Sequence, residues 1–309
     1  MRNTFATTLA ALARDDARVL LLTADLGYLA LEPFSDAFPD RFYNVGVAEQ
    51  TMIGVATGLA DDGFLPFAYS IAPFAVLRPY EFLRNGPLLH RLPVRVVGVG
   101  AGFDYGPAGP THHGIDDAAA LRPQPGLLIV TPADHEQARA ALLATWDHDG
   151  PVYYRLSKDE RVTVPRLDGR FRIGRAEIVR EGDDVALIVM GTLAMEACTA
   201  ADMLAERGVS ASVAIVSTFN PGPVEDVAHL ARTHRLVASV EAQFIDGGLG
   251  SFVAETIAEA GIGTRLVRLG VRGAPHGRSG SRAYHHGVHG LDAAALAERV
   301  LAAFAGGRV

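Results

Sequence analysis

Short runs of consecutive apolar residues, separated by stretches with helical periodicity, constrain the fold of this chain most strongly. The run at residues 94–100 holds only Val and Gly apart from Arg95, so it lacks the alternation of a strand with one face in water. Strands that are apolar on both faces are typical of parallel sheets covered by helices on each side. The sequence therefore predicts an α/β fold with parallel sheets.

The expected elements fall into two groups along the 309 residues, which are enough for two cores. Strands are expected at residues 18–23, 42–45, 94–100, 127–130, 152–156, 185–190, 212–216, 236–240 and 265–269. Helices are expected at residues 3–14, 49–60, 73–85, 116–121, 133–146, 193–207, 224–233, 251–260 and 292–303. The polar segment 158–172, with its Pro and Gly, is expected to be a linker. Two parallel-sheet α/β domains, residues 1–160 and 173–309, are thus predicted.

Charge and cysteine content exclude several classes of protein. A formal net charge of −7 without a basic block argues against nucleic acid or an anionic membrane as the main partner. The only cysteine, Cys198, excludes a disulfide framework and a multi-cysteine metal site. Polar residues such as Thr4 and Arg14 interrupt the first apolar stretch, which predicts neither a signal peptide nor a membrane span and favours a cytoplasmic location.

Glu49 is the only acidic residue in the apolar, glycine-containing stretch at residues 44–60. The helical spacing after it places the carboxylate at or near the start of a helix, which Gly54 and Gly58 allow to pack closely. A buried lone carboxylate can hold or donate a proton near neutrality. The alternative is a glutamate that only caps the helix and complements its dipole.

A loop rich in glycine and proline, residues 101–114, follows the strand at 94–100 and contains His112 and His113. A long loop at a strand end is usually functional, and histidine there can act as acid, base or oxyanion partner. The alternative is that the two histidines only decorate the surface. Phe74, near the start of its expected helix, is placed to lie over a flat ring, or is simply part of the core.

Four other polar residues stand where ligand groups are often found. Asp25 follows a buried strand, a position at which open α/β sheets place ligand groups, although it could equally cap the next turn. Arg2, Arg155 and Lys158 flank strand or helix ends and are candidate anchors for an anion, unless solvent alone surrounds them.

Glu241 and the glycine-rich residues 247–250 suggest a phosphate cradle at first sight. They lack the G-x-G-x-x-G order and the segment follows its strand by several residues, so close packing of a helix on the sheet is expected instead.

A cluster of His285, His286 and His289 has nearly helical spacing and could suggest a metal site. Gly287 and Gly290 are expected to break a helix there, and no carboxylate is spaced to complete a site. The sequence therefore predicts a structural role and no metal site.

Taken together, these residues resemble the pyrimidine-binding and C-terminal domains of the transketolase family of thiamine diphosphate enzymes. The resemblance runs over nearly the whole chain. Its specific parts are residues 44–50, 63–67, Phe74, residues 100–114 with Gly-Pro-Thr-His-His, and residues 132–134.

The resemblance implies a role for each candidate. Glu49 matches the glutamate that hydrogen-bonds N1′ of the cofactor's aminopyrimidine and promotes the tautomer that takes the C2 proton. Phe74 matches the ring stacked on that pyrimidine, and Asp25 falls at the cofactor edge. His112 matches the histidine near the reacting carbon, and His113 matches its neighbour. The cofactor supplies the carbanion chemistry, and the protein positions it.

The family's diphosphate-binding domain carries a Gly-Asp-Gly motif and an Asn that hold the diphosphate and Mg²⁺, and no such motif occurs in this sequence. The resemblance therefore implies the smaller subunit of a split enzyme, with a partner chain that brings the metal site. An α2β2 heterotetramer containing a dimer of this chain is expected.

The substrate positions differ from the usual family pattern. Ala108 stands in place of an aspartate, Gly100 in place of a histidine, and a phosphate-binding serine is replaced near Leu29. Arg2 matches one phosphate-binding arginine and Lys158 stands in place of another. Because unmet polar groups dominate discrimination between sugars, the resemblance implies a changed substrate set.

The first hypothesis is a thiamine-diphosphate-dependent transfer of a two-carbon or acyl unit from a ketose or 2-oxo acid to an aldehyde. The alternatives are a decarboxylating subunit, like deoxyxylulose-phosphate synthase or the β subunit of a 2-oxo acid dehydrogenase, and a non-catalytic scaffold subunit.

Overall fold

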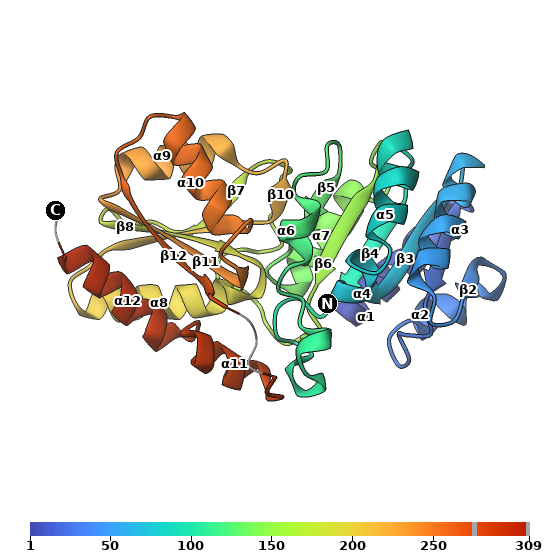
Figure 1. Ribbon diagram of the computed structural model, residues 1–309, viewed down its shortest axis with the longest axis horizontal. Coiled ribbons are helices and arrows are strands. Elements are labelled where there is room, and N and C mark those ends of the chain that lie inside the picture. Colours follow the sequence, from blue (N-terminus) through green and yellow to red (C-terminus); the bar gives the residue numbers. More distant parts are fainter. Residues whose placement is uncertain (274–276, 307–309) are drawn as a thin grey trace.

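Two sheets with helices on their faces lie side by side in the computed structural model, which describes residues 1–273 and 277–306 (Figure 1). The first half of the chain, blue to green, forms one side of the molecule, and the second half, yellow to red, forms the other, apart from a short strand at residues 218–220 that joins the first sheet. No described helix has the length and apolar character that crossing a membrane would require.

Seven strands form the first sheet in the order β10-β5-β6-β4-β3-β1-β2. Their bounds are β1 Val19–Thr23, β2 Phe42–Asn44, β3 Leu65–Ile71, β4 Arg95–Val99, β5 Leu128–Val130, β6 Val152–Leu156 and β10 Thr218–Asn220. All neighbouring pairs are parallel except β10 with β5. Strands β1, β3, β4 and β6 are buried along their whole length, as continuous apolar runs predict.

Five strands form the second sheet in the order β12-β11-β8-β9-β7. Their bounds are β7 Ala176–Arg180, β8 Val185–Met190, β9 Ala211–Val216, β11 Leu236–Phe244 and β12 Arg265–Val271. Only β7 pairs antiparallel, with β9. The predicted α/β class with two mostly parallel sheets is confirmed, whereas the central strand β3 and the antiparallel edge strands β7 and β10 are additions to the prediction.

Helices cover both sheets. Their bounds are α1 Arg2–Asp15, α2 Glu32–Ser35, α3 Glu49–Asp61, α4 Ala72–Val76, α5 Tyr80–Leu83, α6 Asp117–Leu121, α7 His135–Thr145, α8 Ala194–Glu206, α9 Val224–Thr233, α10 Leu249–Glu259, α11 Arg282–His289 and α12 Ala293–Ala305. Single turns are η1 Pro39–Arg41, η2 Arg84–Leu88, η3 Gly106–Ala108, η4 Pro110–His112 and η5 Gly191–Leu193.

The prediction of one helix over residues 73–85 is wrong. The chain forms α4, then a turn at Arg78 and Pro79, then α5, and it continues as a π-helical turn. Proline has no N–H to donate and its ring clashes with the preceding helical turn, so Pro79 interrupts the helix. The interruption places Arg78 in a turn between the two helices.

The prediction that glycines break the helix at the histidine cluster is wrong for Gly287 and right for Gly290. Gly287 lies inside α11, and Gly290 ends that helix with φ of 63°. The Ser281 hydroxyl accepts a hydrogen bond from the Tyr284 N–H and so caps its start.

The polar segment 158–172 is more than a bare linker. Val164 and Leu167 are fully buried in the core of the second half. The Val164 N–H donates to the Asp134 carboxylate at 2.8 Å. The segment therefore packs against residues of both halves of the chain.

Strand register brings several strand ends to one edge of the first sheet. Thr23 pairs with Tyr69, while Val99 pairs with both Ile71 and Leu156. Because parallel strands end together, the segments that follow β1, β3, β4 and β6 meet at this edge, which is where open α/β sheets bind ligands.

Candidate active site

Glu49 is the first residue of α3, and the residue is 1% exposed. The Ser70 hydroxyl, near the end of β3, donates to Oε1 at 3.1 Å. Nη1 of Arg78 donates to both carboxylate oxygens, at 3.0 and 2.9 Å. Glu49 is thus buried as expected, but it is paired with Arg78 and is not a lone carboxylate.

Phe74, in the middle of α4, lies against both Arg78 and His112. The guanidinium carbon of Arg78 is 3.8 Å from the Phe74 ring centroid. The His112 ring meets Phe74 edge-on, with the centroids 4.9 Å apart. No sequence pattern marked Arg78, which belongs to this group only because the turn before α5 points it back at α3.

His112 and His113 have different neighbours. His112 is half-buried, and its Nδ1 shares a hydrogen bond of 2.9 Å with the Thr111 hydroxyl. The centroids of the His112 and Tyr105 rings are 6.4 Å apart. His113 is buried beside Phe103 and His285 of α11. Burial, and then the nearby His285, lower the pKa of His113, which favours a neutral ring.

Asp25 is tied to the segment that leads into α3. Its φ of 56° lies in the left-handed region, which Asp tolerates better than most residues. Its N–H donates to the Asn44 side chain at 2.9 Å, and its carboxylate accepts from the Asn44 amide at 3.1 Å. Asp25 is exposed, and it follows β1 at the strand ends where open α/β sheets place ligand groups.

Tyr105 lies by two of the three predicted anion anchors, Arg2 and Lys158, and was missed by sequence reasoning. The ammonium of Lys158 lies 4.6 Å over the Tyr105 ring. Burial raises the pKa of the Tyr105 hydroxyl, and the nearby Arg2 acts in the opposite direction. A Cβ added to Gly100 would lie 2.1 Å from this ring, so the ring takes up the space beside Gly100. The only sequence signal for this packing is the glycine at position 100, which leaves room for the ring.

Arg155 is no surface anchor for an anion. It is 3% exposed, and its Nε donates to the Asp117 carboxylate at 2.9 Å. Asp117 also accepts from the Tyr153 hydroxyl at 2.6 Å and from the Gln243 amide at 2.5 Å. This buried network links the first sheet to β11 of the second.

The glycines near Glu241 serve close packing, as expected. The Glu241 carboxylate accepts from the N–H groups of Leu249 and Gly250 at the start of α10, at 2.6 and 2.8 Å. A Cβ on Gly248 would lie 2.0 Å from that carboxylate. Burial raises the pKa of Glu241 to about 7 despite these bonds.

The histidines of α11 pack rather than gather around an ion. The rings of His285 and His289 stack on Phe103, and Nδ1 of His286 lies 3.3 Å from the Glu196 carboxylate. Within residues 1–273 and 277–306 there is no group of three or more His, Cys, Asp or Glu side chains arranged to hold a metal ion.

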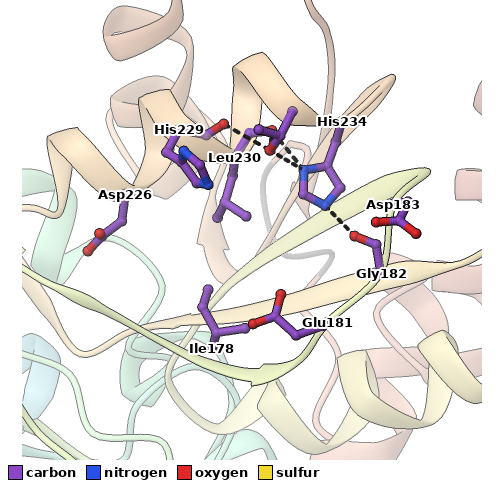
Figure 2. A pocket seen from close by; sticks show the side chains of 9 residues that line it. Ile178, Glu181, Gly182, Asp183, Asp226, His229, Leu230 and His234 are labelled. Atoms are coloured by element: carbon purple, nitrogen blue, oxygen red, sulfur yellow. Dashed lines mark hydrogen bonds between the residues drawn. The ribbon is translucent and has the colours of Figure 1, made fainter.

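A separate cavity of about 290 Å³ lies beside α9 in the second half (Figure 2). Nδ1 of its most buried histidine, His234, lies 2.9 Å from the Leu230 carbonyl, and Nε2 lies 2.8 Å from the Gly182 carbonyl and 3.0 Å from the Ser212 hydroxyl. Both ring nitrogens therefore have partners within the chain.

The candidates that meet at one place are therefore Glu49, Phe74 and His112, joined by Arg78. Tyr105 continues this group toward Arg2 and Lys158 through its contact with His112. These residues fit the aminopyrimidine end of thiamine diphosphate, because the buried Glu49 carboxylate and the face of the Phe74 ring both contact one planar group, the Arg78 guanidinium.

Comparison with known proteins agrees with this geometry. Residues 1–162 match the family described as transketolase, pyrimidine binding domain, and residues 174–296 match transketolase, C-terminal domain. One subunit of the apulose-4-phosphate transketolase of Actinobacillus succinogenes is 34% identical over 271 residues, which cover 88% of this chain and 87% of that protein.

Two further similarities are informative. The 1-deoxy-D-xylulose-5-phosphate synthase 1 of Geobacter sulfurreducens is 37% identical over 86% of this chain, which spans only 42% of that protein. A solved structure described as a split gene transketolase, inactive beta4 tetramer, superimposes with a TM-score of 0.89 at 33% identity and covers 98% of both chains. The chain belongs to the transketolase family, of which it carries the pyrimidine-binding and C-terminal domains.

Proposed function

We propose that this chain is the C-terminal subunit of a split transketolase, which transfers a two-carbon ketol or acyl unit from a ketose or 2-oxo acid to an aldehyde. The convergence of Glu49, Phe74 and His112 at one sheet edge carries this proposal. Thiamine diphosphate, when bound, supplies the carbanion chemistry. A cytoplasmic location remains a prediction.

Each residue has a proposed task. Glu49 holds a proton opposite the pyrimidine nitrogen, in a buried position where water does not compete for it. Phe74 supports the ring from one face, and Asp25 lies at its edge. His112, half-exposed beside Phe74, exchanges a proton with substrate oxygens, and the buried, neutral His113 supports the loop that holds it.

A partner chain is part of the proposal, because the diphosphate and Mg²⁺ need ligands that this sequence does not carry. We propose an N-terminal diphosphate-binding subunit and an α2β2 heterotetramer around a dimer of this chain. Exposed apolar residues on and near α3 and α5 favour burial of this surface against another subunit. They are Val47, Val55, Phe82 and Leu89, which are 41–72% exposed. A cavity of about 380 Å³ between the two helices adjoins them.

Reconstitution with such a partner tests the function. The purified complex, with thiamine diphosphate and Mg²⁺, is expected to transfer a ketol unit between a ketose phosphate and an aldehyde. Release of carbon dioxide from pyruvate would instead favour the synthase-like or dehydrogenase-like alternative, which the 37% identical synthase supports. Calorimetry that detects no cofactor binding, with or without the partner, would favour the scaffold alternative.

A phosphorylated substrate is the class that the anion anchors favour. Lys158 and Arg2 flank Tyr105, and the related transketolase subunit of Actinobacillus succinogenes is named for a sugar phosphate. Replacing Lys158 by Met is expected to raise KM for a phosphorylated substrate about 10- to 100-fold with little change in kcat, because a charged hydrogen bond is lost.

Steady-state kinetics with a phosphorylated aldehyde and its unphosphorylated counterpart measure this effect. The control is Arg161→Met, which changes a neighbouring cation whose side chain is 90% exposed. Equal KM changes for both aldehydes in the Lys158 variant would contradict a role in phosphate binding.

A further inference from the structure

Arg78 contacts both residues proposed to hold the aminopyrimidine. Its Nη1 lies 3.0 and 2.9 Å from the two oxygens of Glu49, and its guanidinium carbon lies 3.8 Å from the centroid of Phe74. A guanidinium is planar and carries N–H donors at its edge, so it can stack on a ring and pair with a carboxylate at once. Those are the two contacts that a protonated aminopyrimidine would make.

The two partners of Arg78 are anchored, whereas Arg78 itself is not. Glu49 is fixed by the start of α3 and by the Ser70 hydroxyl, and Phe74 is held in α4. Arg78 lies in the turn before Pro79, and its side chain is 41% exposed. The guanidinium can therefore move into solvent while the carboxylate and the ring stay in position.

We propose that Arg78 is a placeholder for the aminopyrimidine: it occupies the site between Glu49 and Phe74 in the cofactor-free chain and must swing out before the cofactor binds. This inference rests on the proposed function and adds a residue to its cofactor site. A buried carboxylate without a partner is costly, so the placeholder stabilises the free subunit. The same contact competes with the cofactor. Only chains in which Arg78 has moved away can bind, so the apparent affinity for the cofactor is the intrinsic affinity multiplied by the fraction of such chains.

Calorimetric titration with thiamine diphosphate tests the competition. The full chain is reconstituted with its partner subunit, and Arg78→Met removes the charge and the planar group while keeping the aliphatic stem. The variant is expected to bind thiamine diphosphate about 5- to 30-fold more tightly, since an exposed cation–π contact and a half-exposed ion pair no longer compete.

A second measurement uses the chain alone. Without cofactor, the Arg78→Met chain is expected to unfold about 2–4 °C below the unmodified chain, because Glu49 loses its partner. The free aminopyrimidine alcohol, which lacks the diphosphate, is expected to raise the midpoint of the variant more than that of the unmodified chain. Arg84→Met, which changes an exposed arginine bonded to Asn85, is the matched control and should alter neither property.

The outcomes separate this inference from the proposed function. Equal or weaker cofactor binding by Arg78→Met, together with weakened binding by Phe74→Ala, would overturn the placeholder and leave the function intact. Failure of the unmodified complex and of every variant to bind the cofactor would overturn both. Tighter binding by Arg78→Met with a lower midpoint, neither seen for Arg84→Met, would support the placeholder.

Discussion

Replacing Glu49 by Gln is expected to lower kcat of the reconstituted enzyme about 10²- to 10⁴-fold, the usual range for loss of a positioned acid–base group. Glutamine keeps the size and the acceptor oxygen that the Ser70 hydroxyl uses, but it cannot hold an exchangeable proton. Initial rates at saturating substrate and cofactor measure the loss, and circular dichroism shows whether the fold is retained.

The matched control for this variant is Glu259→Gln, at the exposed end of α10. It is expected to leave kcat within a factor of two, because Glu259 belongs to a helix that covers the second sheet and makes none of the contacts of Glu49 and Phe74. Undiminished turnover by the Glu49 variant would remove Glu49 from the chemistry and, with it, the main support for the proposed function.

Asp117→Ala is expected to have the largest effect on stability. Asp117 is 0% exposed and accepts hydrogen bonds from three buried side chains, including Arg155. Removing the carboxylate leaves the guanidinium buried without its counter-charge, which typically costs about 3–5 kcal/mol. Urea unfolding followed by circular dichroism measures the change in the free energy of unfolding.

A surface pair provides the comparison for that variant. Asp202 pairs with Arg180, but its side chain is 71% exposed, so Asp202→Ala should cost no more than about 1 kcal/mol. A loss for Asp117→Ala as small as that for Asp202→Ala would show that the buried network contributes little to holding the two sheets together.

The sequence predicts most of the strands that lie inside each sheet, because continuous apolar runs such as β4 and β8 need no knowledge of their neighbours. The central strand β3, which contains Pro66, is the exception. Edge strands β7 and β10 are less evident. β10 is only three residues long and is held by a partner strand almost ninety positions earlier in the chain. Pairing between such distant segments leaves little local signal.

The residues of the candidate site also divide into those with a local sequence signal and those without one. Glu49 is conspicuous as a carboxylate in apolar surroundings, and the histidine loop is conspicuous by its length. Arg78 and Tyr105 carry no such mark, because an arginine beside a proline and a tyrosine in a glycine-rich loop are both ordinary. Their importance arises from a helix interruption at Pro79 and from free space at Gly100, which become evident only in three dimensions.

Strand β10 has a consequence for how the chain is assembled. It leaves the second half of the chain and completes the edge of the first sheet beside β5, where Thr131 also donates to the Val216 carbonyl at 3.0 Å. Until β10 has been synthesised, the outer side of β5 lacks its partner strand in this sheet, and an unpaired strand edge is open to pairing with other chains. A three-residue strand from the second half thus closes an edge that the first half alone leaves open.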